Sequence, residues 1–194
     1  MSTKIYYNIS DKNICLIADI LNNGGTVLYP TESVWGLGCN ALLDHAINKI
    51  YEIKKRSDNH PFISLIDQHQ NISKYARNIT KENFNKISNI SPTPTIIYSN
   101  ALPIVKHLSN EKNEIALRVT PFPSLKKLIK HLNAPLISTS ANISGTIPQT
   151  NLSSIHPDII NKVDVILNFD VKLSGKPSSI IKINDKGNID YIRK

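Results

Sequence analysis

Three short segments of the chain combine cationic, hydroxyl and glycine residues in patterns that suit a phosphorylated or acidic ligand. In YPTESVWGLG, residues 29–38, polar groups and glycines follow an apolar stretch, so a ligand could approach the backbone closely. KKRSDNHPF contains Lys54 and Arg56, which could bind adjacent phosphate oxygens, the arginine through a bidentate fork and the lysine as a point charge. PLISTSANISG, residues 135–145, supplies four hydroxyl groups and an amide. Together with Arg118 of ALRVT, these segments predict a cationic, hydroxyl-lined site at three strand ends, where ligands of open α/β sheets gather.

Each segment also has an ordinary structural interpretation, which the sequence leaves open. Glycines after a strand can serve turn geometry alone, and a serine-rich stretch can form a turn without binding anything. Lys54 and Arg56 could instead interact favourably with the dipole at the C-terminus of a helix. Arg118 could pair with an acid, such as Glu114 or Asp164, and hold its strand in place.

Composition favours a cytosolic globular protein. The chain has 194 residues, of which 40% are hydrophobic and 20% charged, which fits a single domain over residues 1–194 and excludes a disordered or collagen-like chain. No apolar run is long enough to cross a membrane, and the first residues do not form a secretory signal. Cys15 and Cys39 make no CxxC pair, so we expect reduced thiols and a cytoplasmic location.

The chain is strongly positive, and lysine supplies most of its positive charge. The formal net charge is +8, which favours polyanionic partners such as RNA or nucleotides, although a solvated lysine surface would give the same value. Lysine outnumbers arginine by 19 to 4, so each arginine is an exception whose position matters.

Familiar nucleotide and metal motifs are missing from the sequence. It contains no GxxxxGK[ST] phosphate loop, no GxGxxG dinucleotide fingerprint and no GxSxG nucleophile elbow. The six histidines form no HxH or HExxH pair, so we expect no metal site built by the protein. If the protein binds a nucleotide, it must do so with a phosphate-binding site other than these common motifs.

Apolar patterns predict strands that alternate with helices. Strands are expected at residues 26–30, 62–66, 95–98, 115–120, 135–141, 163–169, 179–184 and 190–194, the last two joined by a hairpin turn at 185–188. Helices are expected at 11–23 with Ser10 as N-cap, from an Asp44 cap to about Lys55, and at 124–132, with weaker helical patterns between 70 and 90 and a loop at 31–38. This order predicts an α/β fold with a mixed twisted sheet.

The segments YPTESVWGLG, KKRSDNHPF, ALRV and PLISTSANISG, in this order and spacing, resemble the YrdC family of threonylcarbamoyl-AMP synthases over residues 10–194. The resemblance implies a single-domain twisted mixed sheet flanked by helices around a basic cavity (YrdC-like). It also implies the short form of the family, without an extra C-terminal domain.

The activity that this resemblance implies is that of an L-threonylcarbamoyladenylate synthase, a nucleotidyltransferase. It would form threonylcarbamoyl-AMP and pyrophosphate from L-threonine, bicarbonate or CO2, and ATP accompanied by Mg²⁺. The product would serve the threonylcarbamoyladenosine modification of tRNA next to the anticodon. The expected acceptor is the tRNA threonylcarbamoyltransferase complex, and a direct contact with tRNA is left open.

The resemblance also assigns roles to individual residues. Lys54 and Arg56 match the family's KxR pair, expected to be catalytic at the ATP phosphates. The other residues expected to bind ATP are Ser140, Asn142 and Arg193, and those expected to bind threonine are Thr31, Arg118, Ser138 and Ser178. Three of the four arginines fall on motif positions, which suits sites that need a planar fork. Glu32 is only a weak candidate for a metal ligand.

Several positions depart from the family pattern. Many members carry WPGPxT where this chain has ISPTPTI, so Thr93 replaces a glycine and Ile96 a threonine, with Thr95 beside it. Departures at the expected edges of the site are Ser57, Leu65, Phe122 and the pair Phe169 and Asp170. We interpret them as drift in a biased sequence, with reduced activity as the alternative.

Two other function classes remain. A non-catalytic RNA-binding or ribosome-assembly module could use the same basic cavity; it would bind tRNA with a steep salt dependence and without ATP turnover. A carbamoyl-phosphate-dependent transferase shares the implied fold, but such proteins carry additional domains and cysteine zinc motifs that this sequence lacks.

Overall fold

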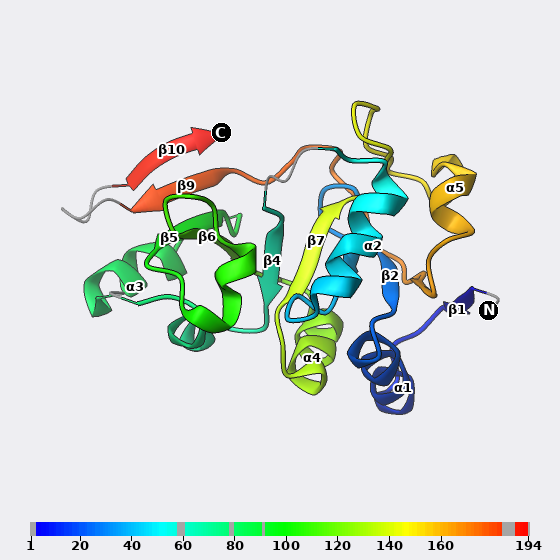
Figure 1. Ribbon diagram of the computed structural model, residues 1–194, viewed down its shortest axis with the longest axis horizontal. Coiled ribbons are helices and arrows are strands. Elements are labelled where there is room, and N and C mark those ends of the chain that lie inside the picture. Colours follow the sequence, from blue (N-terminus) through cyan, green and yellow to red (C-terminus); the bar gives the residue numbers. More distant parts are fainter. Residues whose placement is uncertain (1–2, 58–60, 78–79, 91, 184–188, 194) are drawn as a thin grey trace.

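The computed structural model describes residues 3–57, 61–77, 80–90, 92–183 and 189–193, and its centre is one strongly twisted sheet (Figure 1). The strands are β1 (Lys4–Tyr6), β2 (Thr26–Pro30), β3 (Trp35–Cys39), β4 (Ile63–Ile66), β5 (Thr95–Ser99), β6 (Glu114–Val119), β7 (Leu136–Ser140), β8 (Val165–Leu167), β9 (Ile180–Ile183) and β10 (Ile189–Arg193). They follow the order β1-β8-β2-β3-β7-β4-β6-β5-β9-β10 across the sheet, with both parallel and antiparallel pairs. In Figure 1, β4 and β7 run vertically whereas β9 and β10 run across the view, as an accumulated twist requires. The predicted α/β fold with a mixed sheet is confirmed.

Helices and short 3-10 segments connect these strands. The α-helices are α1 (Asp11–Asn22), α2 (Asp44–Lys54), α3 (Lys81–Ser88), α4 (Pro123–Leu132) and α5 (Pro157–Ile160), and the 3-10 segments are η1 (His69–Lys74), η2 (Pro103–Leu108) and η3 (Leu152–Ser154). α1 begins as predicted, because the Ser10 hydroxyl accepts a hydrogen bond from the Asn13 backbone N–H. The predicted Asp44 cap is wrong: Leu43 is the N-cap and makes no side-chain capping bond. Asp44 instead places a negative charge in the first turn, where the helix dipole favours it.

Alternation of side chains gives the sheet two different faces. One face belongs to a large core that is completed by α2 and η2 and includes Leu37, Ile66, Ile96, Leu117 and Ile137. The other face is covered only in part, by a second core in which α1 and α4 pack against each other, α1 also against β2 and α4 also against β4. The rest of this second face carries glycine, hydroxyl and arginine residues on the central strands, and the candidate site lies there.

The predicted loop at 31–38 is wrong for its second half, because β3 forms there and pairs antiparallel with β2. Glycines normally weaken a strand, but here they permit close packing. A Cβ atom on Gly38 would lie 2.1 Å from the carbonyl oxygen of Ile137, and one on Gly36 would lie 3.1 Å from the ring of Tyr29. The two glycines therefore let β3 fit between β2 and β7.

The remaining expectations for the elements have mixed outcomes. The antiparallel pairing of the last two strands is confirmed, while the predicted hairpin turn at 185–188 lies outside the described residues. The short strand β1 and the one-turn helix α5 have no counterpart among the expected elements. Within the described ranges, no helix has the length and apolar character needed to cross a membrane.

Candidate functional site

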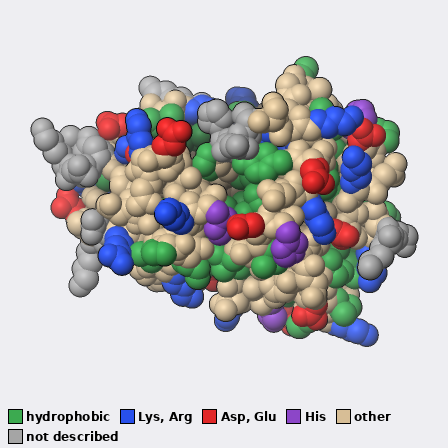
Figure 2. Space-filling view, viewed as in Figure 1, with side chains coloured by type: hydrophobic (Ala, Val, Ile, Leu, Met, Phe, Trp, Pro, Cys, Tyr) green, Lys and Arg blue, Asp and Glu red, His purple; other side chains and the backbone are tan. Residues whose placement is uncertain are grey.

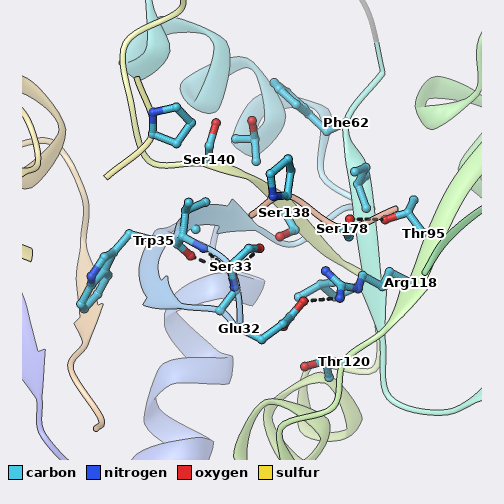
Figure 3. A pocket seen from close by; sticks show the side chains of 18 of the residues that line it. Glu32, Ser33, Trp35, Phe62, Thr95, Arg118, Thr120, Ser138, Ser140 and Ser178 are labelled. Atoms are coloured by element: carbon cyan, nitrogen blue, oxygen red, sulfur yellow. Dashed lines mark hydrogen bonds and ion pairs between the residues drawn. The ribbon is translucent and has the colours of Figure 1, made fainter. Parts of the chain in front are cut away.

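The uncovered part of the sheet forms a cavity of about 620 Å³, within the usual range for small-molecule sites. Its walls come from the central strands, from the turn between β2 and β3, and from the segments that precede β9 and begin α4 (Figure 3). The predicted site residues that line it are Thr31, Arg56, Arg118, Ser138, Ser140, Ser178 and Arg193. The structure thus brings together residues from all three of the segments singled out in the sequence.

The cavity lies where the three predicted segments meet at strand ends, directly after β2, at the start of β4 and at the end of β7, and from there it extends over one face of the sheet. β4 pairs antiparallel with β7 and parallel with β6, so the carboxyl ends of β6 and β7 lie at opposite edges. Arg118 on β6 reaches the same cavity through the strand register. Leu65 on β4 lies opposite both Arg118 on β6 and Leu136 on β7, and Ser138 follows two residues further along β7, on the same face.

Arg118 projects from β6 into the cavity and forms an ion pair with Glu32 of the turn between β2 and β3 (Figure 3). Only 9% of the Arg118 side chain is exposed, and 30% of the Glu32 side chain. The Nε atom of Arg118 is buried and has no hydrogen-bond partner. The guanidinium therefore keeps an unused donor in a largely dehydrated position, which a ligand could satisfy.

The acid that pairs with Arg118 differs from the two that the sequence suggested. Glu114 pairs with Lys182 at the other end of β6, and Asp164 accepts hydrogen bonds from the backbone N–H and hydroxyl of Thr26. Glu32 takes their place because the hairpin between β2 and β3 turns it toward the cavity. No local sequence pattern links Glu32 to Arg118, so this contact could be found only from the fold.

Thr31 organises the turn that carries Glu32. Its hydroxyl donates to the Val34 carbonyl over 2.7 Å and accepts from the backbone N–H groups of Ser33 at 3.1 Å and Val34 at 3.2 Å. The donor and both lone pairs of this hydroxyl are thus used within the turn. Thr31 lines the cavity as predicted, but in this turn its backbone and methyl group are what remain for contact with a ligand.

Lys54, the last residue of α2, is buried and directed at the loop after β7. Its ammonium donates to the carbonyl oxygens of Ser140 at 2.5 Å and Asn142 at 2.8 Å. Its own carbonyl accepts from the Ser144 backbone N–H over 2.9 Å. Lys54 therefore holds the loop that carries two predicted ATP-binding residues, and its direct contact with phosphate stays a prediction.

The buried position of Lys54 predicts a distinctive dependence of stability on pH. Burial and the nearby charge of Arg56 lower the pKa of Lys54 from 10.5 to about 8. Above about pH 8 the folded protein has lost a proton that the unfolded chain still binds, so stability rises with pH up to about 10.5. We expect the free energy of unfolding of the wild type to rise relative to Lys54→Met by up to about 1.4 kcal/mol per pH unit in this window.

Urea unfolding of both proteins at about pH 7, 8, 9 and 10 measures this difference. Lys55→Met is the matched control, because Lys55 is the exposed neighbour of Lys54 and forms an ion pair with Asp158. Parallel pH profiles for the wild type and Lys54→Met would contradict the burial of a charged ammonium.

Arg56 lies in the cavity wall directly after α2, where two aromatic rings support it. Its guanidinium carbon lies 4.8 Å from the ring centroid of Phe62 and 5.9 Å from that of Tyr51. Stacking uses the face of the guanidinium, whereas hydrogen bonds use its edge, so one group can serve both. This geometry is compatible with the predicted contact between Arg56 and phosphate.

Asn142 shapes the loop after β7 from a buried position. Its side-chain amide donates to the carbonyl oxygens of Ile143 at 3.0 Å and Thr146 at 2.5 Å. Its Oδ1 atom is buried and has no hydrogen-bond partner. Asn142 thus stabilises the loop that follows Ser140, and its role at ATP stays a prediction.

Arg193 on β10 connects its strand to the segment that precedes β9, and both are part of the cavity wall. Its Nε and Nη2 atoms donate to the carbonyl oxygen of Ser178 at 3.0 and 2.7 Å. The Ser178 hydroxyl lies 3.1 Å from that of Thr95. Thr95 is fully buried and lines the cavity, whereas Ile96 belongs to the core on the opposite face. A threonine hydroxyl is therefore present on this strand in spite of the departure at Ile96.

Two other departures from the family pattern are in contact with each other. The rings of Phe122 and Phe169 pack edge to face with centroids 6.0 Å apart. Phe122 and Leu65 both line the cavity, so this part of its wall is apolar where many family members carry histidines. Ser57 is exposed and directly follows Arg56.

Comparisons with known proteins agree with this geometry. Residues 19–194 match the Sua5/YciO/YrdC family model, whose description is telomere recombination. The threonylcarbamoyl-AMP synthase of Wigglesworthia glossinidia brevipalpis is 34% identical over 190 residues, which cover 96% of each chain. That of Blochmanniella floridana is 31% identical over 160 residues, 81% of this chain and 83% of its own.

Solved structures show the same fold. Sua5 of P. abyssi in complex with L-threonine has a TM-score of 0.80 at 27% identity over 93% of this chain, which spans 53% of Sua5. YciO of E. coli has a TM-score of 0.80 at 24% identity, over 100% of this chain and 96% of its own. The predicted YrdC-like fold and the nucleotidyltransferase type of enzyme are confirmed at the level of the family. By its sequence match, its fold and its cavity, the chain belongs to the Sua5/YciO/YrdC family.

Proposed function

We propose that this protein is a threonylcarbamoyl-AMP synthase, which forms L-threonylcarbamoyladenylate and pyrophosphate from L-threonine, bicarbonate or CO2, and ATP. The observation that carries the proposal is the buried guanidinium of Arg118, whose Nε donor is unused within a cavity that also contains Arg56 and Arg193. Relatives that span most of the chain carry this name, and a related structure holds L-threonine. A planar fork in a dehydrated site suits the carboxylate of an amino acid.

The reaction asks the protein for positioning and charge neutralisation more than for a nucleophile. The uncharged threonine amine captures CO2 to give a carbamate and releases a proton to solvent. One carbamate oxygen then forms a bond to the α-phosphorus of ATP as the bond to pyrophosphate breaks. Arg118 would hold the threonine carboxylate, and Arg56 would neutralise charge on the phosphates. Lys54 would keep the loop with Ser140 at the correct distance from both.

Mg²⁺ would enter this site with ATP and neutralise the pyrophosphate that leaves. In the part of the chain that the structure describes, no group of three His, Cys, Asp or Glu residues could hold a metal ion. Glu32 is the only carboxylate among the described residues that line the cavity. This donor set fits a metal that is carried mainly by the triphosphate.

The product would supply threonylcarbamoyl groups for the modification of tRNA next to the anticodon. The acceptor would be the tRNA threonylcarbamoyltransferase complex, in the cytoplasm. A mixed anhydride with AMP is labile in water, so the product would be protected best if it stayed in the cavity until its release to the acceptor.

A non-catalytic RNA-binding module is the second candidate, and the net charge of +8 is the observation that favours it. On the face shown in Figure 2, however, basic and acidic side chains are interspersed and do not gather into one basic patch. The two functions differ in whether ATP is turned over.

The test is an assay with purified protein, ATP, Mg²⁺, bicarbonate and labelled threonine, in which pyrophosphate and the adenylate are both measured. We expect pyrophosphate release that stops when either threonine or bicarbonate is omitted. Release that continues without threonine would contradict the proposal. Absence of release together with tight, salt-dependent tRNA binding would favour the RNA-binding module.

A further inference from the structure

One carboxylate stands among the arginines of the cavity, and the charges of the substrates give a reason for it. The charged side chains of the described lining are Glu32, Arg56, Arg118 and Arg193. ATP, bicarbonate and the carboxylate of threonine are all anionic, so an acid in this cavity opposes their binding. The α-ammonium of threonine is the one cationic group that the organic substrates contain, and it is the natural partner of a cavity carboxylate.

Glu32 is held firmly at its place in the cavity wall. The Thr31 hydroxyl closes the turn around it through three hydrogen bonds. The backbone N–H of Ser174 donates to the Glu32 carbonyl over 2.9 Å, and that of Gly175 donates to the Ser33 carbonyl over 2.8 Å. The turn is therefore fixed from within and from the segment between β8 and β9, so its carboxylate is prepositioned beside Arg118.

The ion pair of Glu32 with Arg118 is complementary to the zwitterion of an α-amino acid. One end of the Arg118 guanidinium, Nη2, contacts Glu32, while the buried Nε remains unpartnered. In an α-amino acid only one carbon separates the carboxyl carbon from the nitrogen. A substrate carboxylate on the free side of the guanidinium thus places its ammonium within reach of an adjacent carboxylate.

We infer that Glu32 binds the α-ammonium group of threonine, next to the carboxylate held by Arg118. This inference rests on the proposed function. It adds a residue that selects threonine over the same acid without its amino group. It also gives Glu32 a second purpose, because the same contact holds the nitrogen in one place, where CO2 can reach it once the ammonium has lost a proton.

The test compares threonine with 3-hydroxybutanoate, which is threonine without its amine, in the absence of ATP and Mg²⁺. Affinities are measured by competition with labelled threonine for the wild type and for Glu32→Gln, which keeps the side-chain size and removes the charge. We expect the wild type to prefer threonine and Glu32→Gln to reduce this preference about 10- to 100-fold. The loss should fall on threonine alone, because the hydroxy acid has no cation for Glu32 to bind.

Glu114→Gln is the matched control, since Glu114 also forms an ion pair, with Lys182, outside the described cavity lining. It should leave both ligand affinities unchanged. If Glu32→Gln fails to fold, Glu32→Asp keeps the charge and should retain the preference for threonine in spite of weaker binding. Loss of the preference in Glu32→Asp would count against the inference.

Three results would overturn the inference while the proposed function stands. Equal weakening of both ligands in a folded Glu32→Gln would show that Glu32 acts only by orienting Arg118. Tighter threonine binding would show that Glu32 competes with the substrate for Arg118. An effect that appears only with Mg²⁺ and ATP would make Glu32 a metal ligand. A wild type that binds no threonine and makes no adenylate would instead overturn the proposed function.

Discussion

Replacement of Arg118 by alanine is expected to weaken threonine binding by about 30- to 1000-fold and to leave ATP binding nearly unchanged. A carboxylate left without its partner in a largely dehydrated pocket loses about 2–4 kcal/mol. Calorimetric titration of threonine and of an unreactive ATP analogue measures the two affinities separately. A melting curve of the same samples reports whether the variant still folds.

The contact between Arg118 and Glu32 calls for a second variant, because alanine also leaves a half-buried carboxylate unpaired. Arg118→Lys keeps a positive charge near Glu32 but lacks the planar fork. It should therefore melt close to the wild type and still bind threonine weakly. If Arg118→Ala melts early and loses both ligands while Arg118→Lys binds threonine normally, Arg118 has a structural role only.

Arg56→Lys is expected to lower turnover by about 5- to 150-fold, more than a change that conserves charge usually does. A lysine cannot make two parallel hydrogen bonds to phosphate oxygens, which puts about 1–3 kcal/mol at risk. It also gives up the stacking of a planar group on Phe62. Steady-state kinetics with varied ATP measures the effect on kcat and KM.

Arg77→Lys is the matched control for this substitution. Arg77 is exposed, and its backbone N–H, which the substitution retains, donates to the Asn100 carbonyl. We expect nearly wild-type kinetics from this variant. Equal losses at Arg56 and Arg77 would reject the assignment of Arg56 to the phosphates.

The sequence carries enough information to place most of the cavity wall. Arg118 and Ser138 were both singled out in polar stretches that interrupt apolar segments; they lie on β6 and β7, on either side of β4, and the structure confirms that both line one cavity. Arg56 and Arg193 were conspicuous because arginine is rare in this chain, and both also line it. Residue type and local pattern are therefore sufficient to predict a cavity residue when its position depends only on its own strand or segment.

Contacts between distant segments were beyond local patterns. The strand that contains Gly36 and Gly38 reads as a loop until its close packing beside β7 is known. Lys54 looks like a cavity cation in sequence, yet the end of α2 directs it to two backbone carbonyls. The partner of Arg118 is Glu32, whose position depends on the turn between β2 and β3. In each of these three cases, the packing of a second element determines the structure or the contact that the residue adopts.

The bond between Arg193 and the carbonyl of Ser178 has a practical consequence for handling the protein. The strand that carries Arg193 is an outer strand of the sheet, and its last described residue is already part of the cavity wall. β1 forms the opposite edge, with eight strands between the two. A fluorescent reporter should therefore be attached on β1, because one attached on β10 would stand in the cavity wall and distort the kinetics that it is meant to reveal.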